Sequence, residues 1–294
     1  MIVIDYSQTI ISSLMAEIGS RADVPIEVNL LRHMVINTIR SHKTKFGRDY
    51  GDIVLACDSK KYWRKEVFPY YKANRKKARE ESGFDWPLIF DTINLLKEEI
   101  KAVFPYKVIE IEGAEADDVI ATLAEWSQSN NLVQEGLLER PEPFLIISGD
   151  HDFIQLQKYS NVKQFSPVHK KLIKPETSAE KYVIEHIIRG DKGDGVPNVL
   201  SSDDSIVTGE RQKKIMQKKL DEWIDNPDKM PKDETFRRNY DRNKMLVDLS
   251  SIPQPLKDKI INTFETTAVG DRSKILDYFV INKMKMMMEF IGDF

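Results

Sequence analysis

The sequence contains a single cysteine, Cys57, and this scarcity excludes several kinds of site. One cysteine cannot form a disulfide within the chain or supply a cysteine-rich zinc site, and its apolar neighbours favour a role as core filler. The lack of disulfides fits a reducing, intracellular setting. Long apolar runs are also missing, since none reaches the roughly 18 residues of a membrane span, and the N-terminus lacks the basic start of a signal peptide. We therefore expect a cytoplasmic protein without a membrane partner.

An excess of charge of one sign is missing as well. The 44 basic and 47 acidic residues leave a formal net charge of only −3. Any signal for an anionic partner must therefore come from where the charges lie along the chain. The 294 residues, 41% of them hydrophobic, can bury a sizeable core in one large domain or two smaller ones.

Short apolar runs alternate with helical patterns in the first part of the chain. The runs that predict strands are Ile2–Ile4, Ile53–Ala56, Phe144–Ile147 and Lys107–Ile111. The run Lys107–Ile111 is expected nearer an edge of the sheet. The patterns that predict helices are Leu30–His42, Phe90–Val103 and Ala116–Trp126. This alternation predicts an α/β fold with a mainly parallel sheet flanked by helices.

The pattern changes in two places. The segment Asn130–Pro143 is polar and contains two prolines, which favours a surface loop that can include a short helical piece. After about Lys174 the strand signals fade, and the rest is helix-like with many glycine and proline interruptions. We therefore predict an α/β domain over residues 1–178 and a smaller helical domain over residues 179–294.

Acidic residues follow every predicted strand. They are Asp5, Asp58, Glu115, Asp117, Asp118, Asp150 and Asp152. Ligands of open parallel sheets bind beyond the carboxyl ends of the strands, so these acids are expected to converge. Gathered carboxylates repel one another unless protons or cations neutralise them. Oxygen ligands without cysteine or paired histidine favour Mg²⁺ or Mn²⁺, and two such ions can assist phosphoryl transfer.

Each acid taken alone has a simpler explanation. An aspartate after a strand often caps a helix or stabilises a turn, and the acids of residues 115–118 also suit a helix dipole. Acid at four strand ends together is harder to attribute to capping. Asp191 and Asp194, in the turn GDKGDG, are explained equally well as turn residues or as ligands.

Residues 60–79 combine positive charge with aromatic rings. The stretch KKYWRKEVFPYYKANRKKAR has nine basic residues, one glutamate and five aromatics. Cations neutralise phosphates and rings stack on unpaired bases, although a solvated amphipathic helix with inward rings would look similar. The position directly after Asp58 favours an anionic substrate, with Arg64, Lys72 and Arg75 as candidate phosphate contacts. A second basic stretch, Arg211–Lys219, is weaker evidence.

Several ordered motifs resemble those of the flap endonuclease/5′→3′ exonuclease family, especially its T-even bacteriophage RNase H branch. They are Asp5, Asp58, YKANR at 71–75, EADD at 115–118, SGDHDF at 148–153 and GDKGD at 190–194, with YWR at 62–64, KAREES at 77–82 and NVKQFSPVHKK at 161–171 sharpening the match. The resemblance covers most of residues 2–197 and, more loosely, the remainder. It implies a PIN-like nuclease domain over residues 1–178 with a basic arch near 60–90, and a helical domain over 179–294 that contacts duplex and partners.

The resemblance also implies roles for individual residues. One metal site would use Asp5, Asp58, Asp117 and Asp150 with Glu115 close by, and the other Asp152 and Asp194 with Asp191 nearby or acting through water. The residues implied to act on the scissile phosphate are Lys72, Arg64 and Arg75. Those implied to bind nucleic acid are Lys72, Arg75, Lys76, Lys77, Arg79, Lys213 and Lys214.

The implied activity is that of a magnesium-dependent phosphodiesterase with two Mg²⁺ ions, for which Mn²⁺ can substitute. It would act as 5′→3′ exonuclease, RNase H and flap endonuclease, removing RNA primers and adjacent DNA from lagging-strand fragments in phage DNA replication. The implied partners are DNA duplex with a 5′ flap or fork, RNA–DNA hybrid, a sliding clamp and a single-strand-binding protein. The protein would be a monomer in the cytoplasm of a bacterial host. The C-terminal MMMEFIGDF either docks in the clamp or packs on the core.

The chain departs from the family after GDKGDG. Family members commonly continue with a Gly-Ile-Gly helical hairpin that holds duplex, whereas Asp203 and Asp204 intrude here. A grip by four lysines is the alternative: Lys213, Lys214, Lys218 and Lys219. Two rival functions remain open at this point. A haloacid-dehalogenase-type phosphatase needs a second aspartate two residues after Asp5, where Ser7 stands, and a Rossmann-like binding module would have purely structural acids.

Overall fold

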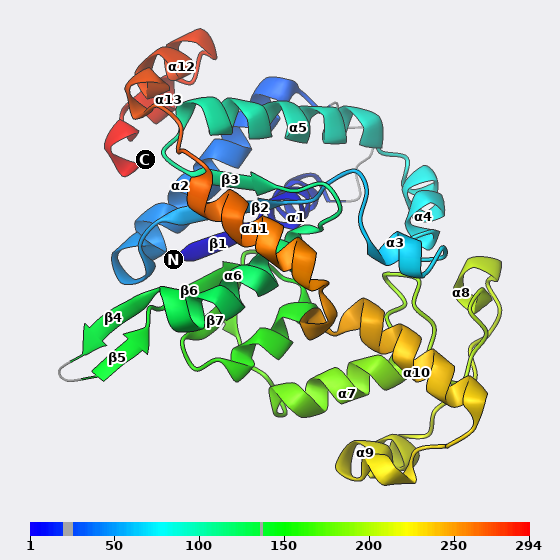
Figure 1. Cartoon of the computed structure of the whole chain (residues 1–294). Helices are drawn as coiled ribbons and strands as arrows, with labels where there is room; N and C mark the ends of the chain where they lie inside the picture. Colours follow the sequence, from blue (N-terminus) through cyan, green and yellow to red (C-terminus); the bar gives the residue numbers. More distant parts are fainter. Residues whose placement is uncertain (20–25, 136–137) are drawn as a thin grey trace.

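The computed structural model describes residues 1–19, 26–135 and 138–294. A six-stranded sheet lies at its centre (Figure 1). In spatial order its strands are β3 (Lys107–Glu110), β2 (Ile53–Cys57), β1 (Ile2–Asp5), β6 (Phe144–Ile147), β7 (Val162–Ser166) and β8 (Lys171–Ile173). All neighbours run parallel except β7 and β8. The α/β fold with a mainly parallel sheet is confirmed, and the strand predicted near an edge is the edge strand β3.

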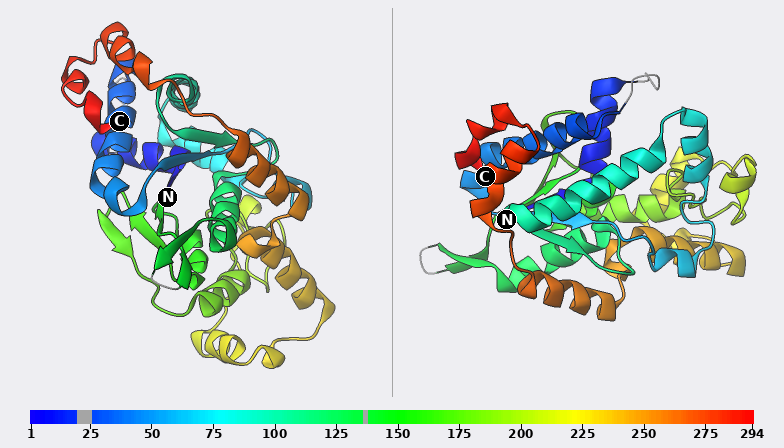
Figure 2. Two further views of the ribbon diagram at one scale, coloured as in Figure 1. Left: turned by 60° about the vertical axis from the view of Figure 1, so that its left-hand side comes forward. Right: turned by 90° about the horizontal axis from the view of Figure 1, so that it is seen from above.

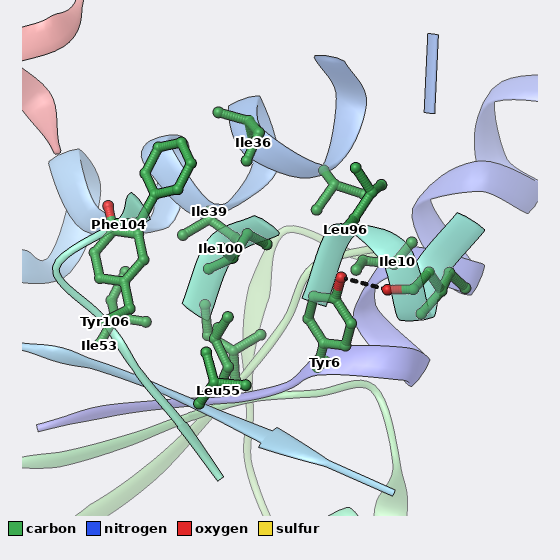
Figure 3. Close-up of a cluster of buried hydrophobic side chains, with 14 of the residues drawn as sticks. Tyr6, Ile10, Ile36, Ile39, Ile53, Leu55, Leu96, Ile100, Phe104 and Tyr106 are labelled. Atoms are coloured by element: carbon green, nitrogen blue, oxygen red, sulfur yellow. Dashed lines mark hydrogen bonds between the residues drawn. The ribbon is translucent and has the colours of Figure 1, made fainter. Parts of the chain in front are cut away.

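The three central strands are buried along their whole length. They read as continuous apolar runs because helices cover both faces of the sheet. On one face Ile2 and Ile4 pack with helices α1 (Tyr6–Ile18), α2 (Val28–Tyr50) and α5 (Trp86–Val103). Figure 3 shows part of this cluster, in which the Tyr6 hydroxyl donates a hydrogen bond of 3.0 Å to the Ile93 carbonyl.

The opposite face of the sheet is covered mainly by α6 (Ala116–Asn130) and α11 (Gln254–Thr266). Val3 points to this side and packs with residues of α6 such as Val119 and Ile120. The three predicted helices lie within α2, α5 and α6. Helices α2 and α6 continue into polar residues beyond the apolar pattern, whereas α5 begins earlier, at Trp86. Helix α1 was not predicted. Asp5 caps its N-terminus by accepting a hydrogen bond from the Gln8 amide.

The prediction of a surface loop over Asn130–Pro143 is wrong. An antiparallel hairpin of β4 (Leu132–Glu135) and β5 (Leu138–Pro141) occupies this segment, with residues 136–137 outside the described part. The hairpin forms through backbone pairing while Leu132 and Leu138 stay exposed, so no apolar alternation marks it. Strands β7 and β8 were missed for a related reason. The buried Gln164 of β7 donates to the Ser148 carbonyl at 3.0 Å, and a polar residue there hides the strand.

The chain after β8 is helical, as expected. Its elements up to residue 247 are α7 (Ala179–Arg189), α8 (Ser205–Thr208), α9 (Gln217–Asp225), the short 3₁₀ turn η2 (Pro227–Lys229) and α10 (Glu234–Val247). They share a core of their own around Ile188, Leu220, Trp223 and Phe236. The elements after α10 return to the sheet: η3 (Leu249–Ser251), α11, η4 (Arg272–Lys274), α12 (Ile275–Ile281), α13 (Lys285–Met288) and η5 (Ile291–Asp293). The division at residues 178 and 179 stays a prediction.

The C-terminal residues pack on the first face of the sheet domain, beside α2 and α5 (Figure 2). Phe294 is 5% exposed, and its ring centroid lies 5.3 Å from that of Phe104 and 5.5 Å from that of Phe279. The tail therefore contributes to the core, which is the packing interpretation of MMMEFIGDF. Among the described residues, no helix is long and apolar enough to cross a membrane.

Candidate active site

Acidic side chains from four segments meet at the carboxyl edge of the sheet. Asp5 ends β1, Asp58 follows β2, Asp117 lies in the first turn of α6, and Asp150 follows β6. The parallel register, with Asp5 beside Ala56 and Ile4 beside Ile147, aligns these strand ends. The convergence expected from the sequence is therefore present.

The electrostatics show how closely these charges interact. Burial, followed by repulsion from Asp58 and Asp150, raises the pKa of Asp5 from 3.8 to about 8. Burial and the charge of Asp152 raise the pKa of Asp150 to about 6. The pKa of Asp117 is also raised well above its ordinary value, by burial and then by Asp150. The protein alone does not compensate this negative charge, which is the setting of a cation site.

The same acids also perform the capping roles that were the simpler explanation. Asp58 Oδ1 accepts from the Ala116 amide at 2.9 Å, and Asp150 Oδ1 accepts from the Asp152 amide at 2.9 Å. Asp5 accepts from the Gln8 amide and from the Ser148 hydroxyl, both at 3.2 Å. Capping and metal binding are compatible here. For Asp58 and Asp150 the hydrogen bonds use one carboxylate oxygen and fix its direction.

The surroundings of Glu115 differ from those of the other acids. It is 1% exposed and forms ion pairs with Arg64, at 2.8 Å, and with Lys72. Burial works against its charged form, but Lys72 and Arg64 outweigh it and hold the pKa of Glu115 below its ordinary value. The charge of Glu115 is therefore compensated within the protein, where it holds the two basic side chains. Its place beside the first metal site stays a prediction.

Arg64 does not occupy the position expected of a phosphate contact. Its side chain is 2% exposed, forms ion pairs with Glu115 and with Asp118 Oδ1 at 2.8 Å, and donates a hydrogen bond to the Leu246 carbonyl at 2.8 Å. Asp118 is fully buried and also accepts from the Trp63 indole at 3.3 Å. Arg64 therefore joins the start of α6 to the end of α10. The expected phosphate role is corrected to a structural one because no substrate can reach the guanidinium.

Lys72 and Arg75 contact a second acid, Asp194. Lys72 Nζ lies 3.6 Å from Asp194 Oδ2, the Arg75 guanidinium pairs with the same carboxylate, and the Tyr71 hydroxyl donates to it at 2.8 Å. Burial is the largest influence on Asp194 and raises its pKa despite both cations. Asp194 and Glu115 outweigh burial at Lys72 and raise the pKa of its amine, which therefore stays charged.

The backbones of these segments are joined as well. The Lys72 amide donates to the Asp194 carbonyl at 2.7 Å, and Lys72 adopts a φ of 57°, which is rare for a residue with a side chain. Gly195 has a φ of 74°, and a Cβ there would lie 2.9 Å from the Tyr70 carbonyl oxygen. This close approach explains why the last residue of GDKGDG is glycine. It ties the basic segment to the turn that carries Asp194.

A histidine that the sequence did not single out faces the remaining acids. His186, on α7, places Nε2 3.2 Å from Asp152 Oδ1 and 3.5 Å from Asp191 Oδ2. Burial opposes its charged form, yet the two carboxylates raise the pKa of His186 to about 10 and His186 lowers that of Asp191. Asp191 Oδ1 also accepts from the Asp194 amide at 3.0 Å, so its role in the turn is present too. The sequence feature that could have identified His186 is its position four residues before Gly190, on a helix that leads into the acidic turn.

The basic stretch of residues 60–79 is not one amphipathic helix. It comprises α3 (Arg64–Val67), a turn and the start of α4 (Asn74–Ser82), with several of its rings buried as the structural alternative expected. Lys76 and Lys77 are exposed, while Arg79 lies 4.9 Å over the Phe90 ring. Lys213 and Lys214 are exposed on the helical part. Their contacts with nucleic acid stay predictions.

One of the two acids that replace the expected hairpin, Asp203, has a structural explanation. Asp203 accepts from Arg238 at 2.8 Å and from Arg242. Arg242 also donates to the Pro197 carbonyl at 3.0 Å. These contacts attach the segment after the GDKGDG turn to α10.

Two family models match the chain and together span it. The model for the 5′-3′ exonuclease N-terminal resolvase-like domain matches residues 2–183, and that for the T4 RNase H C-terminal region matches residues 177–294. The chain belongs to the 5′-3′ exonuclease family. The family inferred from the motifs is confirmed, and the chain is a hydrolytic nuclease, which sets aside the phosphatase and the non-catalytic binding module.

Individual relatives agree with this family. Ribonuclease H of Enterobacteria phage T4 is 36% identical over 302 residues, covering 99% of this chain and 95% of the phage protein. A 5′-3′ exonuclease of Buchnera aphidicola is 31% identical over 172 residues, 56% of this chain and 53% of that protein. A bacteriophage T5 flap endonuclease, solved with DNA and metal ions, has the same fold with a TM-score of 0.60 at 18% identity, covering 90% of this chain and 97% of that one.

Proposed function

We propose that this nuclease is a divalent-metal-dependent 5′→3′ exonuclease with RNase H and flap endonuclease activities. In this proposal it removes RNA primers and adjacent DNA from lagging-strand fragments during phage DNA replication, in the cytoplasm of a bacterial host. Its substrates would be RNA–DNA hybrid and DNA duplex with a 5′ flap or fork. The family and the name of the phage T4 relative support this role. The observation that carries it is the cluster of mutually repelling carboxylates at the sheet edge.

The residues fit two divalent cations, Mg²⁺ with Mn²⁺ as a substitute. The donors at the first site are all oxygens, the ligands that hard cations prefer. They are Asp5, Asp58, Asp117 and Asp150. The second site would use Asp152 and Asp194 with Asp191 beside them. Such ions supply charge neutralisation at the phosphate and a more acidic water nucleophile.

The basic side chains of the chain would position the phosphate. Lys72 is 12% exposed on its side chain and stays charged between Glu115 and Asp194, so it borders both acidic clusters. Arg75, 41% exposed, lies beside it and can reach outward. We assign these two residues to the scissile and adjacent phosphates. Lys76, Lys77 and Arg79 would contact the strand farther out along α4.

Asp150→Asn tests the proposal because it removes a charge and keeps the cap of the turn that follows β6. Cleavage of a 5′-labelled flap and of an RNA–DNA hybrid in Mg²⁺ should fall by at least about 100-fold, while DNA binding measured by fluorescence anisotropy in EDTA is retained. The matched control is Asp52→Asn, whose carboxylate is 95% exposed at the other end of β2. Near-normal turnover by Asp150→Asn, or equal cleavage by the wild type with and without Mg²⁺, would contradict the proposal.

The helical part would grip duplex through Lys213, Lys214, Lys218 and Lys219, all of which are exposed. Alanine at all four should weaken duplex binding and reduce the slope of log affinity against log salt, because each phosphate contact releases counterions. An unchanged slope would refute this grip. We also propose that the nuclease works with a single-strand-binding protein and that it is a monomer. Sedimentation of the pure protein tests the monomeric state.

A sliding clamp would bind the C-terminal tail. Since Phe294 is buried in the core, Phe290 is the better probe: its side chain is 37% exposed and stacks under Arg40 at 3.8 Å. Phe290→Ala should abolish stimulation by the clamp and spare clamp-free cleavage. Equal loss of both would favour a packing role for the whole tail.

A further inference from the structure

One side chain in the second acidic cluster is not an oxygen donor. His186 Nε2, Asp152 and Asp191 offer three potential ligand atoms that all lie within 4.8 Å of one another. The side chains are 18%, 15% and 25% exposed, so the group is mostly enclosed yet reachable from solvent. These residues come from α7, the turn after β6 and the glycine-rich turn.

The spacing of these atoms suits a shared cation. With bonds of about 2.0–2.2 Å, two adjacent ligands of a tetrahedral or octahedral ion lie about 3.0–3.5 Å apart. Nε2 lies 3.2 Å from Asp152 Oδ1 and 3.5 Å from Asp191 Oδ2. The imidazole nitrogen is therefore spaced from each carboxylate as two adjacent ligands of one ion are.

The imidazole directs this nitrogen at the two carboxylates. Nε2 is buried and forms ion pairs with Asp152 and Asp191. The ring is held in place by stacking on Tyr182 one turn earlier on α7, with centroids 5.7 Å apart and planes 13° from parallel. A fixed ring that aims a buried nitrogen between two acids has the arrangement of a metal ligand once an ion replaces the proton.

We propose that His186 supplies a nitrogen ligand to the second metal site, together with Asp152 and Asp191, so that this site binds first-row transition ions in preference to Mg²⁺. The inference rests on the proposed function, since it concerns one of the two metal sites of that nuclease. Mg²⁺ prefers oxygen donors, whereas imidazole favours transition ions. An ion and a proton compete for the same Nε2 lone pair, and both are drawn there by the same two carboxylates. The two sites of the chain would then differ in metal preference.

The test uses Mn²⁺ alone as the probe, with the full-length chain and without nucleic acid. Pulsed electron paramagnetic resonance of bound Mn²⁺ should show nitrogen hyperfine coupling from imidazole in the wild type and none in His186→Gln. Calorimetric titration should show at least a tenfold loss of Mn²⁺ affinity at one site, because even partners outside the coordination shell change affinity by about 10- to 100-fold. Mg²⁺ affinity should change much less.

His151→Gln is the matched control. His151 is exposed and lies between Asp150 and Asp152 in sequence, so it is the neighbouring imidazole that could otherwise explain a signal. The control should keep the coupling. Loss of the coupling in His151→Gln but not in His186→Gln would overturn the assignment, as would coupling that survives in His186→Gln.

The wild-type spectrum decides the matter even if His186→Gln fails to fold. Bound Mn²⁺ without nitrogen coupling would overturn the inference, and Mg²⁺-dependent cleavage by the same preparation would show that the proposed function stands. Absence of cleavage with every divalent ion tried would instead count against the proposed function, and the inference would fall with it.

Discussion

Replacing Asp5 with asparagine should stabilise the metal-free protein at alkaline pH. Asp5 is 4% exposed, and burial together with Asp58 and Asp150 raises its pKa from 3.8 to about 8. The asparagine carbonyl can still accept the hydrogen bond from the Gln8 amide, and its NH2 group can donate to the Ser148 hydroxyl, which now donates to Asp5 Oδ2. The substitution therefore removes the charge and keeps the cap of α1.

The sign and size of the effect follow from the raised pKa. Asp5 holds its proton more tightly in the folded chain than in the unfolded chain. The free energy of unfolding of the protein therefore falls as the pH rises from the unfolded pKa of Asp5, 3.8, to its folded pKa, about 8. At about 1.4 kcal/mol per pKa unit, the ceiling is roughly 6 kcal/mol. The ceiling is not reached, because Asp150 titrates in the same cluster and shares the proton. We expect a gain of about 2–4 kcal/mol at pH ~8.5 and of about 1 kcal/mol at pH ~5.

Urea denaturation followed by circular dichroism, in EDTA at both pH values, measures this gain. The control is Asp52→Asn, which removes an exposed carboxylate and should change stability little at either pH. An equal gain at both pH values, or a loss at the higher one, would refute the reasoning. In saturating Mg²⁺ the gain should shrink or reverse, because bound ligand stabilises the wild type by RT ln(1 + [L]/Kd) and the variant lacks a ligand.

Three further substitutions test the structural interpretation. Arg64→Met should cost about 3–5 kcal/mol in urea denaturation, because it leaves Glu115 and Asp118 buried without their shared cation; a cost below about 1 kcal/mol would contradict the buried network. Phe294→Ala should lower stability by about 2–4 kcal/mol, since the ring packs on Phe104 and Phe279, and an unchanged Tm would show that the tail does not contribute to the core. Gly195→Ala should cost about 1–3 kcal/mol and reduce hybrid cleavage, because a Cβ meets the Tyr70 carbonyl; normal thermal unfolding and cleavage would show that this close approach is not required.

The parts of the fold that could be predicted are those where burial dictates composition. Strands β1, β2 and β6 are covered on both faces and so leave an uninterrupted apolar record. The hairpin of β4 and β5 leaves none, because backbone pairing holds it together while Leu132 and Leu138 face solvent. In β7 the NH2 group of the buried Gln164 donates to the Ser148 carbonyl, a pairing between distant residues that no local pattern reveals.

The candidate site also has residues whose position could be predicted from the sequence and residues whose position could not. Asp5, Asp58 and Asp150 could be placed from strand ends, since parallel strands deliver them to one edge. The direction of Arg64 could not, because only the packing of α10 against α3 shows that this cation faces inward. Glu115 and Asp117 look equivalent in EADD, but Glu115 is the extended N-cap residue of α6 while Asp117 lies inside its first turn, so their side chains have different surroundings. His186 was missed because one histidine on an apolar helix face is usually a core residue.

The sharing of Asp194 has a consequence for how the binding of metal and the binding of nucleic acid are coupled. Tyr71, Lys72 and Arg75 all contact this carboxylate, and the Lys72 amide holds its backbone. A cation that draws charge from Asp194 loosens the hold on both basic side chains, which then become available to a phosphate. Thermodynamic linkage makes this reciprocal, so nucleic acid that engages Lys72 and Arg75 must tighten the binding of the cation by the same factor. With the proposed metal and phosphate sites, the enzyme would thus favour phosphate and metal together over either one alone.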